Sequence, residues 1–268
     1  MTHRAKIAAG PIARAAALPT RASIVARHDA RVLLDSVRWL VRSREHTNFT
    51  YDLEERNVEH LAWFAASVAD APVDEIRGYL AELESDTSLR GHLESYAAAS
   101  PVRGLTDRRA RYGRRAGWYA LVRALRPEHV VETGTDKGLG TCVLAAAMLR
   151  NGRGRVTTID TNPAAGSLIG RPFAGVVDLL CGDSVILLPK LDAVDFFIHD
   201  SRHTVEHEAA ELEAVPLTVD AVALSDNAHV TDVLAGWAAR TGRHFLYFQE
   251  QPRDHWYPGA GIGVAWRR

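Results

Sequence analysis

A glycine-rich segment near the middle of the chain has the residue types of a loop that holds a nucleotide-like ligand. Residues 130–141 read VVETGTDKGLGT, so an apolar run ending in Glu132 precedes glycines at 134, 138 and 140. Glycine has no Cβ, which permits positive φ angles and lets a ligand approach the backbone. Three residues separate the first two glycines, whereas the G-x-G-x-x-G pattern of dinucleotide-binding proteins has one. This spacing disfavours a nicotinamide-dependent oxidoreductase.

A second acid lies where the ribose of an adenosine is expected. Asp160 ends the next apolar run, residues 155–160, shortly after the glycine loop. An acid at this place can accept hydrogen bonds from both ribose hydroxyls. A glycine loop alone can be no more than a tight turn. Strand, loop, helix and a second acid-ended strand together indicate an adenosine-containing ligand.

Further polar side chains follow two later apolar runs. Asp200 comes directly after residues 194–199, and Asp226 and Asn227 come after residues 221–225. The carboxyl ends of parallel strands meet at one edge of a sheet, so these three side chains could converge. Two carboxylates and an amide oxygen suit Mg²⁺ or another divalent cation. Alternatively, Asp200 is only a helix N-cap and Asp226-Asn227 only a turn pair.

Three histidines lie close to the first of these acids. His199, His203 and His207 are spaced four residues apart, which on a single helix could form a zinc site. We do not expect that site, because His199 falls within an apolar run and the helical pattern begins after it. His203 can also be a surface histidine without a chemical role.

Short apolar runs alternate with helical patterns in the second half of the chain and would position these groups. The predicted strands are 129–133, 155–160, 176–180, 194–199, 221–225, 244–248 and 262–266. The predicted helical stretches between them are 140–150, 184–188, 204–214 and 230–241, with a short turn near 163–169. This alternation predicts an α/β fold, a doubly wound and mostly parallel seven-stranded sheet. The last two strands have no helix between them, which predicts an antiparallel last strand.

The first hundred residues show helical patterns and no strand. We expect helices over residues 22–46, 53–68 and 72–83, and a fourth over 107–125. Residues 1–21, rich in Ala and Arg, are expected to form a poorly ordered tail; they also resemble a transit peptide, although the arginine excess runs through the whole chain. The predicted organisation is a tail (1–21), a helical region (22–105) that forms a lid or an oligomer interface, and a ligand-binding catalytic domain (106–268).

Composition excludes several classes of protein. The chain has 268 residues and a formal net charge of −1, so no overall field attracts nucleic acid or anionic lipid. Its two cysteines, Cys142 and Cys181, lie in segments that read as buried, which argues against a disulfide scaffold and for a reducing, cytoplasmic location. No apolar run approaches the roughly 20 residues that span a bilayer.

With the glycine loop and Asp160 in place, residues 110–268 resemble the class I S-adenosylmethionine-dependent methyltransferases, which have a Rossmann-like sheet. The resemblance implies that the three glycines line the methionine part of the cofactor, that Asp160 holds the ribose and that residues 181–184 approach the adenine. The full set of implied cofactor-binding residues is Glu132, Gly134, Thr135, Gly138, Gly140, Thr141, Asp160, Asp183, Ser184 and Asp200.

The acids after the fourth and fifth predicted strands resemble those of metal-dependent O-methyltransferases, both the catechol type and the type acting on macrolide sugars. The resemblance implies that Asp200, Asp226 and Asn227 hold Mg²⁺ and that His203 is the catalytic base, with His229 as the alternative. The expected acceptor is a hydroxyl of a small molecule, such as a sugar or a glycosylated natural product. A metal-independent N- or O-methyltransferase and a non-catalytic cofactor-binding scaffold remain open.

Two segments could close an acceptor pocket. One is residues 46–52, which are polar and aromatic between helical patterns, and the other is residues 255–261, which join the last two predicted strands. Aromatic side chains in such a loop can equally serve packing alone. A homo-oligomer through the N-terminal helices is the expected assembly.

Overall fold

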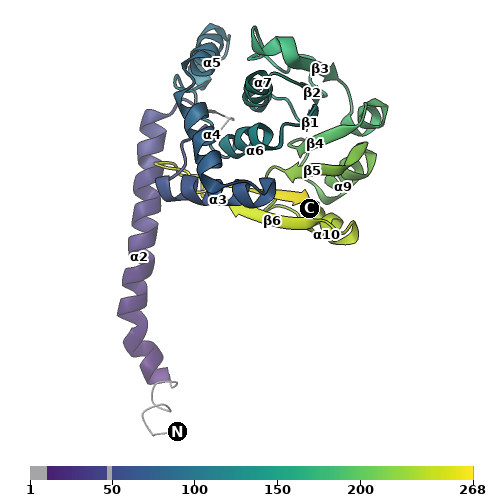
Figure 1. The fold of residues 1–268 in the computed structure, drawn as a ribbon. Helices are drawn as coiled ribbons and strands as arrows, with labels where there is room; N and C mark the ends of the chain where they lie inside the picture. The colour runs from purple at the N-terminus through teal and green to yellow at the C-terminus, as the bar shows by residue number, and fades with distance from the viewer. Residues whose placement is uncertain (1–10, 47–49, 268) are drawn as a thin grey trace. The chain divides into compact units, whose positions relative to one another are not determined.

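The computed structural model describes residues 11–46 and 50–267, and its centre is one seven-stranded sheet (Figure 1). The strands are β1 (His129–Thr133), β2 (Arg155–Asp160), β3 (Val177–Cys181), β4 (Val194–His199), β5 (Leu217–Ser225), β6 (His244–Gln249) and β7 (Gly261–Trp266). They lie in the order β3-β2-β1-β4-β5-β7-β6. Strands β1 to β5 pair in parallel, and β7 runs antiparallel to both β5 and β6. The predicted doubly wound, mostly parallel sheet with an antiparallel last strand is confirmed.

Helices cover both faces of the sheet (Figure 1). Helix α6 (Arg115–Leu125) leads into β1, and the helices that connect the strands are α7 (Leu139–Asn151), α8 (Ser184–Leu187), α9 (Val205–Ala214) and α10 (Val233–Arg240). Short 3₁₀ turns occur at η1 (Arg103–Leu105), η2 (Phe173–Val176) and η3 (Leu188–Lys190). Helices α3 (Glu55–Ala69) and α4 (Val73–Ser85) pack against α6, and α5 (Thr87–Ala99) packs against α7.

The centre of the sheet is apolar because both of its faces are covered. All five residues of β1 and all six of β7 are buried, and Phe196, Phe197 and Ile198 of β4 have no exposed surface. Strands buried on both faces read as continuous apolar runs, which is why these elements could be placed from sequence. The chain reverses its direction of winding between β1 and β4, and ligands bind at such a switch point, beyond the carboxyl ends of the strands.

Some boundaries differ from the predicted ones. Helix α6 begins at Arg115 rather than near residue 107, β5 begins at Leu217 rather than 221, and α5 was not predicted. Helix α5 starts after Asp86, whose side chain accepts a hydrogen bond from the Leu89 amide. Its apolar face is narrow, with Leu89 and Leu93 as its buried residues, so its periodicity in the sequence is weak.

The chain forms two compact units. Of the described residues, one unit contains 11–43 together with Asp254–Tyr257, and the other contains 44–46, 50–253 and 258–267. The described part of the first unit is α2 (Pro11–Arg42) with the short loop segment. Helix α2 starts eleven residues before the predicted helix, because an Ala- and Arg-rich segment favours helix and proline is well accommodated at the first helical position. The expected tail therefore applies at most to residues 1–10, which lie outside the described residues.

Within the first unit, aromatic side chains pack together. The Trp39 ring lies edge-on to His255 and Trp256, with ring centroids 5.3 and 5.9 Å away. Among the described residues, no helix is long and apolar enough to cross a membrane.

Candidate functional site

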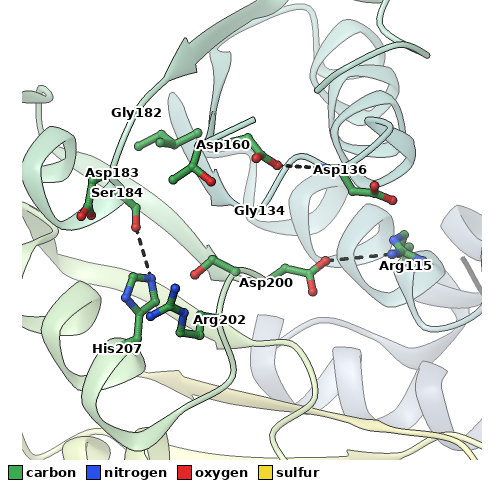
Figure 2. Close-up of a pocket in the computed structure, with 13 residues that line it drawn as sticks. Arg115, Gly134, Asp136, Asp160, Gly182, Asp183, Ser184, Asp200, Arg202 and His207 are labelled. Atoms are coloured by element: carbon green, nitrogen blue, oxygen red, sulfur yellow. Dashed lines mark hydrogen bonds and ion pairs between the residues drawn. The ribbon is translucent and has the colours of Figure 1, made fainter. Parts of the chain in front are cut away.

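A pocket of about 530 Å³ lies at the carboxyl ends of β1, β2 and β4 (Figure 2). The loops that follow β1, β2, β3 and β4 each contribute to its wall, and Arg115 contributes from the start of α6. Its lining residues are Arg115, Gly134, Asp136, Ile159, Asp160, Thr161, Gly182, Asp183, Ser184, Asp200, Ser201, Arg202 and His207. Five of the predicted cofactor-binding residues are among them: Gly134, Asp160, Asp183, Ser184 and Asp200.

Gly134 lines the pocket where the loops after β1 and β4 meet. It has a φ of +89°, and a Cβ at this position would collide with the carbonyl oxygen of Asp200. The Asp200 amide also donates to the Thr133 carbonyl at 2.9 Å. Only glycine allows this close approach, so the first glycine of the loop is required by the backbone of the site itself.

Gly138 and Gly140 do not line the pocket. Gly138 has a φ of +93°, and a Cβ there would lie 2.8 Å from Cγ1 of Ile169. At Gly140 a Cβ would collide with the Glu132 carboxylate and lie 2.7 Å from the Trp118 ring. These glycines make room for protein side chains, whereas the resemblance had implied that they face the cofactor.

Glu132, Thr135 and Thr141 form a buried layer beneath the glycine loop. The Glu132 carboxylate accepts hydrogen bonds from Thr141 Oγ1 at 2.5 Å and Thr158 Oγ1 at 2.8 Å, and Thr158 also bonds Thr135 Oγ1 at 2.7 Å. Burial raises the pKa of Glu132 to about 7, although the two hydroxyl donors lower it. All three predicted residues therefore support the loop from below and do not line the pocket.

The acids on the β2 and β3 side of the pocket hold their own loops. Asp160 accepts from the Asp136 amide at 2.9 Å and from the Asn162 amide at 2.8 Å. Asp183 caps the short helix α8 by accepting from the Val185 amide at 2.9 Å. Both line the pocket, as predicted, and each has carboxylate lone pairs left for a ligand.

Glu211 of α9, which sequence reasoning missed, ties together the loops that line this pocket. It has no exposed surface, and it accepts hydrogen bonds or ion pairs from His199 Nδ1 (2.6 Å), Thr133 Oγ1 (2.7 Å), Ser201 Oγ (2.8 Å), His207 Nε2 (2.9 Å) and Ser184 Oγ. These donors follow or end β1, β3 and β4, or lie on α9. Burial favours a raised pKa for Glu211, but the donors outweigh it and lower the pKa to about 2. One ionised carboxylate thus fixes several walls of the pocket.

The contact between His199 and Glu211 bears on the predicted absence of a helical histidine zinc site. His199 ends β4 and is bonded to Glu211, so His199, His203 and His207 do not share a helix. His199 lies on β4 and His207 on α9, so one helix does not present all three side chains.

The predicted metal ligands and base converge beside the pocket. Ligand atoms of Asp200, His203 and Asp226 lie within 4.8 Å of one another, and His203 Nε2 is 3.7 Å from Asp200 Oδ1. The Asn227 amide nitrogen lies 2.9 Å from His203 Nε2 and 3.2 Å from Asp226 Oδ2. In residues 11–46 and 50–267, no other three His, Cys, Asp or Glu side chains bring their ligand atoms within 4.8 Å of one another. His229, the alternative base, is exposed.

A buried arginine that the sequence did not single out pairs with one of these ligands. Nε and Nη2 of Arg114 donate to the two carboxylate oxygens of Asp226, and Nη1 contacts Tyr51 Oη at 3.1 Å and Glu250 Oε1 at 3.3 Å. Arg114 is 8% exposed, and Asp226 and Glu250 have no exposed surface. Tyr51 belongs to the segment predicted to be a lid; residues 47–49 of that segment lie outside the described residues.

The titratable groups in this cluster have pKa values that shift in different directions. Burial raises the pKa of Asp226, but Arg114 outweighs this effect and lowers the pKa to about 2. Burial and the nearby charge of Asp226 raise the pKa of Asp200 well above its usual value. Burial lowers the pKa of His203. The effects on the two aspartates are therefore opposite in sign, and burial favours the neutral form of the His203 ring.

Residues 131–226, which contain the glycine loop and both aspartates, match a family model described as a methyltransferase domain. The chain carries a methyltransferase domain. The strand order and the reversed β7 are those of the class I, S-adenosylmethionine-dependent fold, as the resemblance implied.

Solved structures of this methyltransferase fold are similar to the chain at low sequence identity. The O-methyltransferase TomG from Streptomyces achromogenes, in complex with SAM, shares 19% identity with a TM-score of 0.52, covering 65% of this chain and 88% of TomG. Cofactor-bound Rv0187 from MTB also shares 19% identity, with a TM-score of 0.54, covering 68% of this chain and 92% of Rv0187. At this identity the likeness shows the fold. No curated protein matches the chain.

Proposed function

We propose that this methyltransferase transfers the methyl group of S-adenosylmethionine to a hydroxyl of a small molecule, with a divalent cation at Asp200, Asp226 and Asn227. One observation carries the proposal: Asp200 lines the pocket and also belongs to the cluster with His203 and Asp226. A cofactor in the pocket would therefore present its methyl group beside groups able to bind and deprotonate an acceptor. The similar TomG protein is an O-methyltransferase, and its structure is in complex with SAM, which supports this proposal.

The chain's own residues can perform the protein's part of an in-line transfer. The reacting oxygen must be held close to the sulfonium methyl group, in line with the bond that breaks. An aliphatic hydroxyl is a poor nucleophile, so its proton must leave as the new bond forms. His203 is suited to accept that proton, because burial lowers its pKa and so favours the neutral ring, and its Nε2 lies 3.7 Å from Asp200 Oδ1.

The donor set fits a divalent cation in charge and type. Carboxylate and amide oxygens are the ligands that Mg²⁺ prefers. The charge of Asp226 raises the pKa of Asp200, and a bound cation would offset this repulsion between the two carboxylates. When bound there, the cation would stabilise negative charge developing on the acceptor oxygen. The amide group of Asn227 can present its oxygen instead of its nitrogen after a simple rotation.

A second candidate, metal-independent transfer, is favoured by Arg114. Its guanidinium group already occupies both oxygens of Asp226 and supplies a buried positive charge. In that case the aspartates would order the site and His203 would act as base without a metal. The two candidates share a cofactor pocket and differ in their response to chelation.

Binding and turnover measurements separate the candidates. We expect S-adenosylhomocysteine to bind the wild-type protein, and Mn²⁺, followed by electron paramagnetic resonance, to bind in a way that Asp226→Asn weakens at least about tenfold. Turnover would be followed as S-adenosylhomocysteine release with a panel of catechols, sugars and glycosides. Loss of turnover on chelation and recovery with Mg²⁺ supports the metal; full turnover after chelation, with no Mn²⁺ bound, selects the metal-independent candidate. Failure of S-adenosylhomocysteine to bind would refute both.

His203 and His229 provide a matched pair of variants for the base. We expect His203→Ala to lower turnover about 100-fold or more while leaving the affinity for S-adenosylhomocysteine within about twofold. His229→Ala should leave turnover nearly unchanged, because that side chain is exposed. The reverse pattern would assign the base to His229.

A further inference from the structure

Two adjacent arginines at the start of α6 differ sharply in their pairing. Every nitrogen of the Arg114 guanidinium group contacts an acid or a tyrosine. The Arg115 guanidinium group makes no hydrogen bond to any residue in 11–46 or 50–267, and its buried Nε has no partner there. Its nearest acid is Asp200, with Nη2 and Oδ2 4.0 Å apart, which is beyond hydrogen-bond distance.

Arg115 is nevertheless held in place. Its side chain is only 14% exposed, and its guanidinium carbon lies over the Trp118 ring at 5.6 Å from the centroid. Its one ion pair, with Asp200, is long, and a largely buried guanidinium group that has lost water without gaining hydrogen bonds is costly. A cation fixed in this way, whose donors make no hydrogen bond within the described residues, is suited to an anionic ligand.

The position of Arg115 in the pocket limits which part of a ligand it can meet. Figure 2 shows Arg115 and Asp136 at one end of the pocket and Asp183, Ser184 and His207 at the other, with Asp200 between. Asp160, whose predicted role is to hold a ribose, lies on the wall between the two ends. A nucleoside held by Asp160 and Asp183 would therefore point its 5′ substituent toward Arg115.

We propose that Arg115 binds the α-carboxylate of the cofactor's methionine part, a step that rests on the proposed S-adenosylmethionine-dependent function. Guanidinium and carboxylate groups match in charge and planar geometry and can form two parallel hydrogen bonds. The methionine part also has an ammonium group, and Asp136 supplies a carboxylate at the same end of the pocket (Figure 2). This end is thus complementary to a zwitterion, whereas the other end offers hydrogen-bonding groups for a nucleoside.

A pair of ligands isolates this contact from the rest of the pocket. S-adenosylhomocysteine contains the amino-acid carboxylate, and 5′-methylthioadenosine shares the nucleoside and thioether but lacks the amino-acid part. Calorimetry with both ligands should show that Arg115→Gln weakens S-adenosylhomocysteine binding about 10- to 100-fold and changes 5′-methylthioadenosine binding less than about twofold. Retained 5′-methylthioadenosine binding also shows that the variant is folded. Arg115→Lys should recover part of the loss, because it restores the charge without the planar fork.

Arg202, the other arginine that lines the pocket, provides the matched comparison. Arg202→Gln should affect the two ligands equally or not at all. The proposal is overturned if Arg115→Gln weakens both ligands equally, or if Arg202→Gln and not Arg115→Gln selectively weakens S-adenosylhomocysteine. If neither ligand binds the wild-type protein, the proposed cofactor fails, and this result is distinct from failure of the arginine assignment alone.

Discussion

Two buried glutamates beneath the pocket, Glu132 and Glu211, are equally buried, but their pKa values shift in opposite directions. Each is at most 1% exposed, and burial by itself would raise the pKa of both. Glu132 accepts two hydroxyl hydrogen bonds and has a pKa of about 7, whereas Glu211 also faces two histidines and has a pKa of about 2. The number and charge of the donors, rather than burial, therefore decide whether a buried carboxylate is ionised.

Because of this difference in pKa, the two halves of the pocket floor are stabilised in different ways. Under the loops that follow β3 and β4, Glu211 is ionised over the whole physiological pH range and fixes its neighbours electrostatically. Under the glycine loop, Glu132 changes its charge near neutral pH. The first half is thus anchored by a permanent charge, and the second by packing and two threonine hydroxyls.

Replacing Glu211 should have the largest effect. Glu211→Gln removes the charge and turns an NH₂ group toward side chains that are themselves donors, so we expect a loss of about 4 kcal/mol in the free energy of unfolding at pH 7. Urea denaturation measures it, with Glu213→Gln, an exposed acid on the same helix, as the control within about 0.5 kcal/mol.

The pH dependence provides an independent check on Glu211. Its lowered pKa means that its stabilisation is fully present above about pH 4.5 and is lost as the pH falls toward 2. Glu211→Gln should lack this acid-dependent loss. If the variant loses as much stability at low pH as the wild type does, the acid-dependent loss does not come from Glu211.

Glu132 should show the opposite sign. Its unfolded form releases its proton near pH 4.5 and its folded form near pH 7, so stability decreases as the pH rises through that window. Glu132→Gln should remove this decrease, so that the stability difference between variant and wild type shifts by about 3 kcal/mol between pH 4 and pH 8. Unfolding measured in urea at both pH values tests this; equal slopes for the two proteins would show that Glu132 is ionised throughout.

Overpacking at Gly140 should act through Glu132. A Cβ would collide with the Glu132 carboxylate and press on the Trp118 ring, so we expect Gly140→Ala to cost about 2 kcal/mol. Gly78 of α4 has no heavy atom within 4 Å of an added Cβ, and Gly78→Ala should be neutral or stabilising by about 0.5–1 kcal/mol. If both substitutions stabilise the protein equally, the tight contact at Gly140 does not exist.

Removing one donor from Glu211 should give the smallest effect. Ser201→Ala deletes one of several hydrogen bonds and is expected to cost about 1 kcal/mol. Ser95→Ala, which removes an exposed hydroxyl bonded to the His92 carbonyl on α5, is the control. If Ser201→Ala lowers the free energy of unfolding as much as Glu211→Gln does, the stabilisation is not distributed over the several donors.

Sequence patterns located the fold and the acids of the site for a physical reason. Strands β1, β2 and β4 are buried runs with sharp ends, so the side chains that follow them, such as Asp160 and Asp200, were assigned to the correct edge. Convergence of Asp200 with Asp226 followed from the order of parallel strands.

Contacts between distant residues could not be derived in this way. Arg114 meets Asp226 across 112 positions and Glu211 meets Thr133 across 78, and no local pattern encodes such pairs. For Glu211, the sequence offered one signal: it is an acid four residues after His207, a spacing that brings the two side chains together on a helix. The glycine motif was read correctly as a loop, but whether Gly138 and Gly140 face a ligand or the protein depends on side chains from outside the motif, Ile169 and Trp118.

The contact between Gly134 and the Asp200 carbonyl has a consequence for engineering new acceptor specificity. The loop that carries the glycines and the loop that carries Asp200 touch through their backbones, so neither can be exchanged for a relative's loop without reshaping the other. A chimera that imports both loops from one donor protein keeps this fit, whereas one that imports a single loop brings together backbones that were never matched. Altered selectivity is therefore better sought at side chains around the aspartate than by replacing its loop.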